Sequence, residues 1–147
     1  MEKRYKRIFA ALDGGSTQRD VARHALSIAE SDNADVMFGH VIDSVPYESN
    51  GVDFAALCNA SKERIEEELA DIFAEAKTNE RIGNVELKVA AGRINDTLVD
   101  QLIEPYNPDL VICGERGLSN IRYVFVGSVS THLIRNCRCD VLVMKHN

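Results

Sequence analysis

The feature that most constrains the fold is the alternation of short apolar runs with longer amphipathic segments along the whole chain. Apolar runs of strand length occupy residues 7–13, 35–43, 85–91, 110–113 and 141–145. Between them, apolar residues recur at helical spacing in four segments: after Thr17, over 53–77, after Asn95 and over 128–136. Strands that alternate with helices form parallel sheets with right-handed crossovers. The pattern therefore predicts one α/β domain over residues 1–147, with five strands and four helices.

Local signals predict where some of these elements begin and end. Thr17 with Asp20 three residues later resembles a capping box, with Asp in place of the usual Glu. Asn95 can cap the third helix, and the stretch from Pro105 to Pro108 is expected to end it. Residues 85–91 alternate apolar and polar side chains, as a half-exposed strand does. That alternation predicts an edge position in the sheet.

Composition narrows the class of protein. The chain has 147 residues, of which 45% are hydrophobic and 27% are charged, as is usual for a globular domain. Its net charge is −6 and its pI is about 5.2, which argues against a nucleic-acid-binding surface, since such a surface needs a basic field.

The sequence also carries expectations about location. No apolar run approaches the roughly 18 residues of a membrane helix, and the first residues lack the long apolar stretch of a signal peptide. Four cysteines in a chain of this size are expected to be free thiols in a reducing cytoplasm. We therefore expect a cytoplasmic protein without a membrane partner.

Three glycines in the last third of the chain suggest a binding loop. Gly114 ends the fourth apolar run, Gly117 follows it, and Gly127-Ser128 stands where the last helix should begin. Glycines let backbone N–H groups approach an anion, and the first N–H groups of a helix have no partner within it. Ser128 and Ser130 add hydroxyl groups at that terminus. The alternative is that these are simply turn glycines.

The spacing G-x2-G-x9-G-S resembles the nucleotide loop of the universal stress protein family, in its ATP-binding branch. The resemblance extends over nearly the whole chain. The segments that carry it are Ile8 to Ser16, His40-Val41, Gly92-Arg93-Ile94, Pro108 to Gly114 and Cys139 to Met144. It implies a doubly wound, three-layer α/β/α domain with strand order 3-2-1-4-5. In that order strands one and four are adjacent, and the direction in which the chain builds the sheet reverses between them. Ligands in such sheets bind outside the strand ends at this topological switch point.

The resemblance also implies roles for individual residues. Asp13 would lie at the adenine, although an Asx-turn or a helix cap is the alternative interpretation of this residue. The side chains expected to form the base pocket are Ala11, Leu12 and Val41. Gly114 and Gly117 would lie under the ribose and α-phosphate. The Ser128 hydroxyl and the N–H groups of Ser128, Val129 and Ser130, next to Gly127, would hold the β- and γ-phosphates.

Three charged residues in the glycine loop bear on affinity. Arg116 is a candidate phosphate partner, and Arg122 is a weaker one. Glu115 opposes an anion unless it faces solvent, pairs with Arg116 or helps to hold a divalent ion. The expected cofactor is ATP or another adenine nucleotide, with Mg²⁺.

Other constellations are missing from the sequence. There is no G-x4-G-K-[ST], no G-x-G-x-x-G and no nucleophile elbow, and the histidines show no metal-ligand spacing. Cys137-x-Cys139 is not C-x-x-C, which favours packed or surface thiols over a redox pair. The chain has no obvious general base to activate water, so we expect binding rather than enzymatic turnover. Slow hydrolysis or self-phosphorylation on Ser128 or Ser130 stays open.

Two functions remain after this reading. The first is a regulatory stress-response protein that binds ATP and changes conformation or partners. The second is a nucleotide-free interaction module, as in the family branch that lacks the glycine loop. In both, the apolar last strand from Val141 to Lys145 is expected at a sheet edge, where the resemblance implies homodimerisation. A protein partner is expected as well, but the sequence does not identify it.

Overall fold

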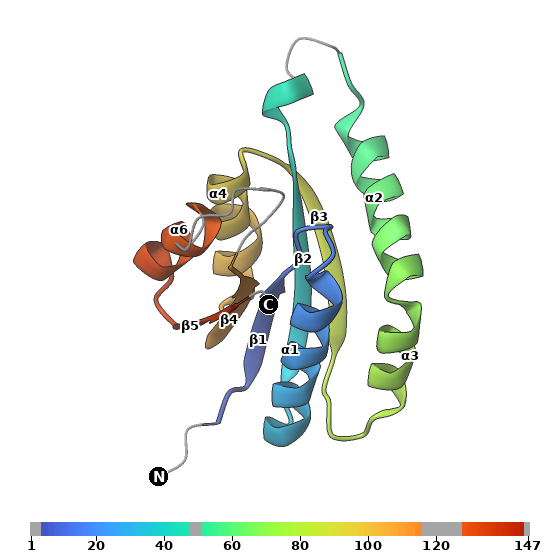
Figure 1. The fold of residues 1–147 in the computed structure, drawn as a ribbon, viewed down its shortest axis with the longest axis vertical. Coiled ribbons are helices and arrows are strands. Elements are labelled where there is room, and N and C mark those ends of the chain that lie inside the picture. Colours follow the sequence, from blue (N-terminus) through green and yellow to red (C-terminus); the bar gives the residue numbers. More distant parts are fainter. Residues whose placement is uncertain (1–3, 48–50, 116–127, 146–147) are drawn as a thin grey trace.

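The computed structural model describes residues 4–47, 51–115 and 128–145. Its centre is a five-stranded parallel sheet in the order β3-β2-β1-β4-β5 (Figure 1). The strands are β1 (Arg7–Ala11), β2 (Asp35–Asp43), β3 (Val85–Gly92), β4 (Leu110–Gly114) and β5 (Asp140–Met144). The predicted strand order is confirmed, and β3 and β5 occupy the two edges.

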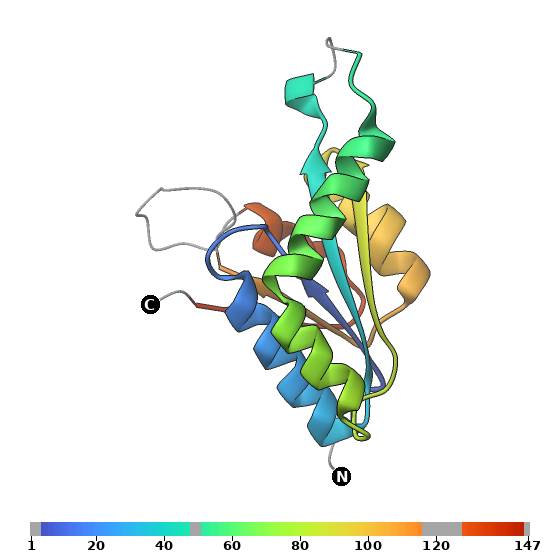
Figure 2. The same ribbon diagram turned by 90° about the vertical axis from the view of Figure 1, so that its right-hand side faces the viewer.

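Helices cover both faces of the sheet and complete three layers (Figure 2). One face is covered by α1 (Gln18–Asp32), α2 (Phe54–Glu68) and α3 (Ala70–Thr78). The other is covered by α4 (Ile94–Thr97), the π-helix η2 (Leu98–Ile103), α5 (Glu104–Tyr106) and α6 (Ser128–Asn136). A single 3₁₀ turn, η1 (Val45–Tyr47), follows β2. The doubly wound fold is thereby confirmed.

The central strands are buried on both sides, which explains their continuous apolar sequences. In β2, Val36 and Phe38 belong to the core on the α1 face, whereas Met37 and Val41 belong to the core on the α6 face. Gly39 lies between them, and a Cβ at this position would overlap the Phe9 ring. A glycine is therefore required here by close packing.

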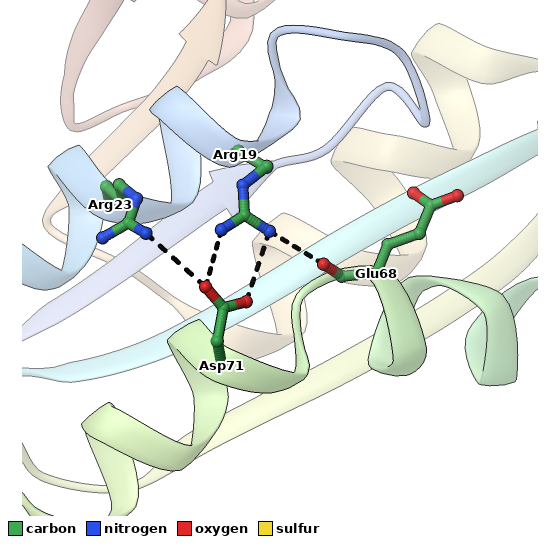
Figure 3. Close-up of polar contacts among 4 residues, drawn as sticks. All are labelled: Arg19, Arg23, Glu68 and Asp71. Carbon is green, nitrogen blue, oxygen red and sulfur yellow. Dashed lines mark hydrogen bonds and ion pairs between the residues drawn. The ribbon is translucent and has the colours of Figure 1, made fainter.

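The predicted helix over 53–77 is wrong in one respect, since it divides at Leu69 into α2 and α3. Leu69 has φ −107° and ψ 18°, and its side chain is fully buried. The carbonyl of Glu68, released from the helix at this break, accepts a hydrogen bond of 2.8 Å from Arg19 Nη1 of α1 (Figure 3). A tertiary contact thus satisfies the carbonyl, and no glycine or proline marks the break in the sequence.

Two of the predicted helix boundaries are confirmed and one is wrong. Thr17 is the N-cap of α1, as expected, but makes no side-chain capping bond. Asn95 lies inside α4, whose N-cap is Arg93. The third predicted helix ends at Tyr106, within the expected stretch from Pro105 to Pro108. The preceding turn widens into a π-helix, where the Glu104 N–H donates to the Val99 carbonyl. This widening accommodates a proline that has no N–H of its own to donate.

Within the three described stretches, no helix is both long enough and apolar enough to cross a membrane. The same stretches contain all four cysteines, and each is a free thiol.

Candidate functional site

The candidate site lies where β1 and β4 end side by side. These strands pair in parallel, with Ile8 opposite Leu110 and Ala10 opposite Ile112. After β1 the chain passes to α1 on one face of the sheet, whereas α6, the helix after β4, lies on the other face. The carboxyl ends of β1 and β4 are therefore the topological switch point, which is where ligands bind in doubly wound sheets. The loops that begin at Asp13 and Gly114 meet at this edge.

The turn after β1 is organised around the Asp13 carboxylate. Its Oδ1 accepts a hydrogen bond of 2.7 Å from the Gly15 N–H, and its Oδ2 accepts one of 3.4 Å from Thr17 Oγ1. Gly14 between them has φ +78°, a left-handed conformation that glycine adopts readily. The Asx-turn considered for Asp13 is thus present. An ionised carboxylate has about four lone-pair positions, so this turn leaves capacity to accept a ligand N–H.

Two of the three residues expected in the base pocket lie on one face. Val41, at the end of β2, is in the core on the α6 face, and Ala11 packs against that core. Val129 of α6 packs there too, together with Ile94. We call Ala11, Val41 and Val129 the apolar wall. Leu12, by contrast, is 4% exposed in the core on the α1 face, so its side chain lies on the opposite side of the sheet.

The two serines at the start of α6 have different surroundings. Ser128 is exposed in the first turn. Ser130 is 1% exposed, and its Oγ donates to the Gly114 carbonyl at 3.1 Å and lies 3.4 Å from the Glu115 carbonyl. The Ser130 hydroxyl is therefore used within the protein, whereas the Ser128 hydroxyl faces the surface. The first N–H groups of α6 have no helical partner and carry the positive end of the helix dipole.

Several predicted residues lie outside the described part of the chain. These are Arg116, Gly117, Arg122 and Gly127. Glu115 is described, and its N–H donates to the Met144 carbonyl at 2.8 Å, which continues the contact between β4 and β5. Val129 and Ser130 follow Ser128 in the first turn of α6, as expected.

His40 is a residue at this site that the sequence analysis did not select. Its Nδ1 lies 2.8 Å from the Leu12 carbonyl, at the point where β1 gives way to the Asp13 turn. The signal for it was available, since a histidine directly before Val41 must end at the same edge of the sheet. Among the described residues, no three His, Cys, Asp or Glu side chains are placed to hold a metal ion.

A hollow of about 450 Å³ opens beside the switch point, on the α1 face. Its lining comes from one side of α1 and from the ends of β4 and β5. The residues are Thr17, Asp20, Val21, Arg23, His24, Ser27, Gly114, Glu115, Met144 and Lys145. Its described lining contains none of the apolar wall, so it is separate from the base pocket expected on the α6 face, although it includes Gly114 and Glu115 of the predicted loop. The signal for this hollow in the sequence was the recurrence of polar residues at helical spacing in α1.

The thiols behind the site are unsuited to nucleophilic chemistry. Burial first, and then the neighbouring Cys139 and Cys113, raise the pKa of Cys137 to about 11. Burial also raises the pKa of Cys113, whereas a hydrogen bond with Ser130 acts in the opposite direction. A thiol with a raised pKa stays protonated at neutral pH, and the thiolate is the reactive form.

A family model and a relative in sequence match the chain over nearly its full length. The model of the universal stress protein family matches residues 4–145. A Staphylococcus aureus (strain USA300) protein whose name places it among the universal stress proteins is 33% identical over 141 residues. That alignment spans 96% of this chain and 84% of the relative.

Solved structures show the same fold at lower sequence identity. Universal stress protein UspA from Lactobacillus plantarum superposes with a TM-score of 0.81 at 21% identity, covering 97% of this chain and 99% of that one. A universal stress protein solved in complex with cAMP has a TM-score of 0.65 at 23% identity, covering 97% of this chain and 98% of that one.

Proposed function

Because the chain belongs to the universal stress protein family, we propose that it is a regulatory protein that binds an adenine nucleotide, ATP above all. The site is the edge where β1 and β4 end. The observation that carries the proposal is the meeting of three features at this edge: the Asp13 turn, the apolar wall and the first turn of α6. An adenine needs an apolar surface and a polar partner, and a phosphate chain needs unpaired N–H groups.

The proposed roles follow from the position of each group. The adenine lies against the side chains of Ala11 and Val41, and the remaining lone pairs of Asp13 accept its amino group. The phosphates lie at the N-terminus of α6, with Ser128 as the hydroxyl donor. Ser130 keeps its bond to Gly114 and contributes its backbone N–H only. Gly117, Gly127 and Arg116 complete the phosphate loop in this proposal.

Mg²⁺ is expected to arrive with the nucleotide. Magnesium in nucleotide sites is held mainly by phosphate oxygens and water, with one or two protein ligands. A protein cage of three or more ligands is therefore not required of this site. Glu115 follows Gly114 in the loop that is expected to hold the phosphates, so its carboxylate is the candidate protein ligand for the ion.

The choice among adenine nucleotides is left to experiment. One structural relative is described as a complex with cAMP. ATP and cAMP share the adenine and ribose, but cAMP has a single cyclic phosphate. We favour ATP because the N-terminus of α6, with Ser128, offers donors for a longer phosphate chain. Calorimetry with both ligands distinguishes the two.

The proposed activity is a nucleotide-dependent switch with little or slow hydrolysis. The sequence has neither a Walker-type lysine nor a nucleophile elbow. Binding without rapid turnover suits a regulator, and ATP in the cytoplasm, where free thiols persist, would be its signal. Steady ATP turnover faster than about one per second by the purified protein would contradict the proposal.

We further propose that the protein forms a homodimer through β5. This strand is at the sheet edge, and its apolar residues from Val141 to Met144 are only partly buried. Ile134 of α6 is 53% exposed. An apolar edge strand favours pairing with a second copy of itself, which buries the strand and satisfies its backbone groups. Light scattering tests this, because a monomer at micromolar concentration would rule it out.

The experiment for nucleotide binding is calorimetric titration of the purified protein with ATP and Mg²⁺. Ser128→Ala should weaken binding by roughly 10- to 150-fold, since a hydrogen bond to a charged group contributes about 1.5–3 kcal/mol. Ser27→Ala, which removes a hydroxyl from the hollow on the α1 face, is the matched control and should bind as the parent does. Equal weakening by Ser27→Ala would place the nucleotide in that hollow instead.

A further inference from the structure

We propose that His40 is a positioning residue, which holds the β1–α1 turn in the conformation that presents the Asp13 carboxylate. Its imidazole contacts the chain on both sides of Asp13, at the Leu12 carbonyl and beside Gly14. It is not assigned a contact with the nucleotide. Its effect on affinity rests on the proposed function, whereas its effect on the turn does not.

The contact before Asp13 is a hydrogen bond with a defined direction. His40 Nδ1 lies 2.8 Å from the Leu12 carbonyl oxygen. A carbonyl oxygen only accepts, so Nδ1 must carry the hydrogen. The Leu12 N–H in turn donates to the Gly39 carbonyl at 2.8 Å. Both backbone polar groups of Leu12 are thus held by consecutive residues of β2.

The contact after Asp13 is one of packing. A Cβ built on Gly14 would lie 3.4 Å from His40 Cε1 and 3.7 Å from Nε2. The Cε1–Nε2 edge of the ring therefore lies beside the turn. Gly14 is in the left-handed conformation, and the Gly15 N–H that follows it donates to Asp13 Oδ1. One side chain accordingly supports the segment that runs from Leu12 to Gly15.

The consequence concerns preorganisation of the carboxylate. The Asp13 turn connects a strand to a helix, and its geometry depends on how the chain leaves β1. Without the Nδ1–H donor the partly buried Leu12 carbonyl loses its side-chain partner, and an unpaired buried acceptor favours rearrangement. A rearranged turn would cost affinity, because the ligand would then have to order it on binding.

The test uses two variants of the same shape. Asparagine and leucine both branch at Cγ, but only asparagine places an N–H donor where His40 has Nδ1. His40→Asn should bind ATP within about threefold of the parent, and His40→Leu should bind about tenfold more weakly, which is the loss of one hydrogen bond. Equal affinity of His40→Leu and the parent would overturn the proposal, as would failure of His40→Asn to restore binding.

A second readout needs no nucleotide. Amide hydrogen exchange of Gly15 reports the bond to Asp13 Oδ1 in the free protein. The Gly15 amide should exchange about tenfold faster in His40→Leu than in the parent and should keep its protection in His40→Asn. Unchanged exchange in His40→Leu would overturn the proposal even if ATP binds. If the parent binds no adenine nucleotide, the proposed function fails while this arm still decides the role of His40.

A measurement on the unaltered protein covers the case in which His40→Leu does not fold. Nitrogen-15 spectra of the neutral histidine distinguish a hydrogen on Nδ1 from one on Nε2. The proposal requires the Nδ1–H form for His40. Observation of the Nε2–H form would overturn it.

Discussion

Ser130 and Gly114 are sixteen residues apart in sequence, and a hydrogen bond of 3.1 Å joins the Ser130 hydroxyl to the Gly114 carbonyl. It links the first turn of α6 directly to the end of β4. The position of the α6 N-terminus relative to the switch point is therefore set by a described contact, independent of the glycine loop between them. The first N–H groups of α6 are held at the edge where β1 also ends.

This contact predicts different outcomes for two neighbouring serines. Ser130→Ala should lower the free energy of unfolding by about 1–3 kcal/mol, because it leaves the Gly114 carbonyl without its side-chain partner. Ser128→Ala should change it by less than about 0.5 kcal/mol, since Ser128 is exposed. Urea denaturation measures both. The reverse order of the two effects would contradict the assignment of Ser130 to structure and Ser128 to the ligand.

Gly39→Ala should destabilise the protein by about 1–3 kcal/mol through overpacking. The new Cβ would overlap the Phe9 ring and would lie 3.3 Å from Leu102 Cδ1. The Gly39 carbonyl also accepts from the Leu12 N–H, so the disturbance should reach the Asp13 turn. Urea denaturation gives the size of the effect.

Phe9→Leu provides the control for that variant. It shortens the side chain that the new Cβ would meet, so Gly39→Ala should cost less in the Phe9→Leu background than alone. Additive effects of the two changes would show that the overlap is not the source of the destabilisation.

Arg19→Gln should raise the pKa of the Asp71 carboxyl. In the parent this pKa lies below its ordinary value, first because Arg19 donates to Asp71, with a closest ion-pair distance of 2.7 Å (Figure 3). The ion pair therefore contributes its full stabilisation at pH values above the ordinary carboxyl pKa. This contribution is lost as the pH falls through the lowered pKa of Asp71 in the folded protein. Both side chains are about half exposed, so the effect on stability is small and falls with added salt.

The measurement is a carbon-13 titration of the Asp71 carboxyl. Arg23 lies 3.6 Å from the same carboxylate and serves as the control, since Arg23→Gln should raise the Asp71 pKa less. A larger rise of the Asp71 pKa in Arg23→Gln than in Arg19→Gln would show that Arg23, and not Arg19, is the main partner of this carboxylate.

Tyr106 should titrate above the ordinary range of a tyrosine. Burial raises the pKa of Tyr106 to about 12, and the nearby Asp35 acts in the same direction. The Arg7 guanidinium, 4.4 Å from the ring centroid, opposes the shift. The stabilisation from the neutral phenol is present below the ordinary tyrosine pKa and is lost as pH rises towards 12.

Absorbance at alkaline pH measures this titration. Tyr106→Phe should remove the late-titrating phenol. Asp35→Asn should lower the Tyr106 pKa, because a neighbouring negative charge disfavours the phenolate. No change in the late phase on Tyr106→Phe would assign it to another tyrosine.

The strands could be predicted from sequence because a parallel sheet covered on both faces needs continuous apolar strands, whereas their order was implied only by the family resemblance. Residues 35–43 are such a run, and β2 has those bounds. The break at Leu69 could not be predicted, since it depends on a buried side chain and on Arg19 some fifty residues away. The cap at Asn95 failed because local propensity is weaker than tertiary packing.

The candidate site was predicted in outline, but not the direction of each side chain. Consecutive residues of a strand point to opposite faces, so Ala11 and Leu12 could not both line one pocket, a conclusion that strand periodicity alone allowed. The contact of Ser130 with Gly114 needed the three-dimensional arrangement of α6 on β4. The expected adenine and phosphate roles of the site residues stay predictions.

The most direct test of the central claim is calorimetric titration of the purified protein with ATP and Mg²⁺, repeated on Gly127→Val. The account predicts saturable binding by the parent and its loss in Gly127→Val, because a side chain at this position would keep the phosphates from the N-terminus of α6. No heat of binding by the parent at millimolar ATP would contradict the account, and the protein would then be an interaction module that acts without a nucleotide.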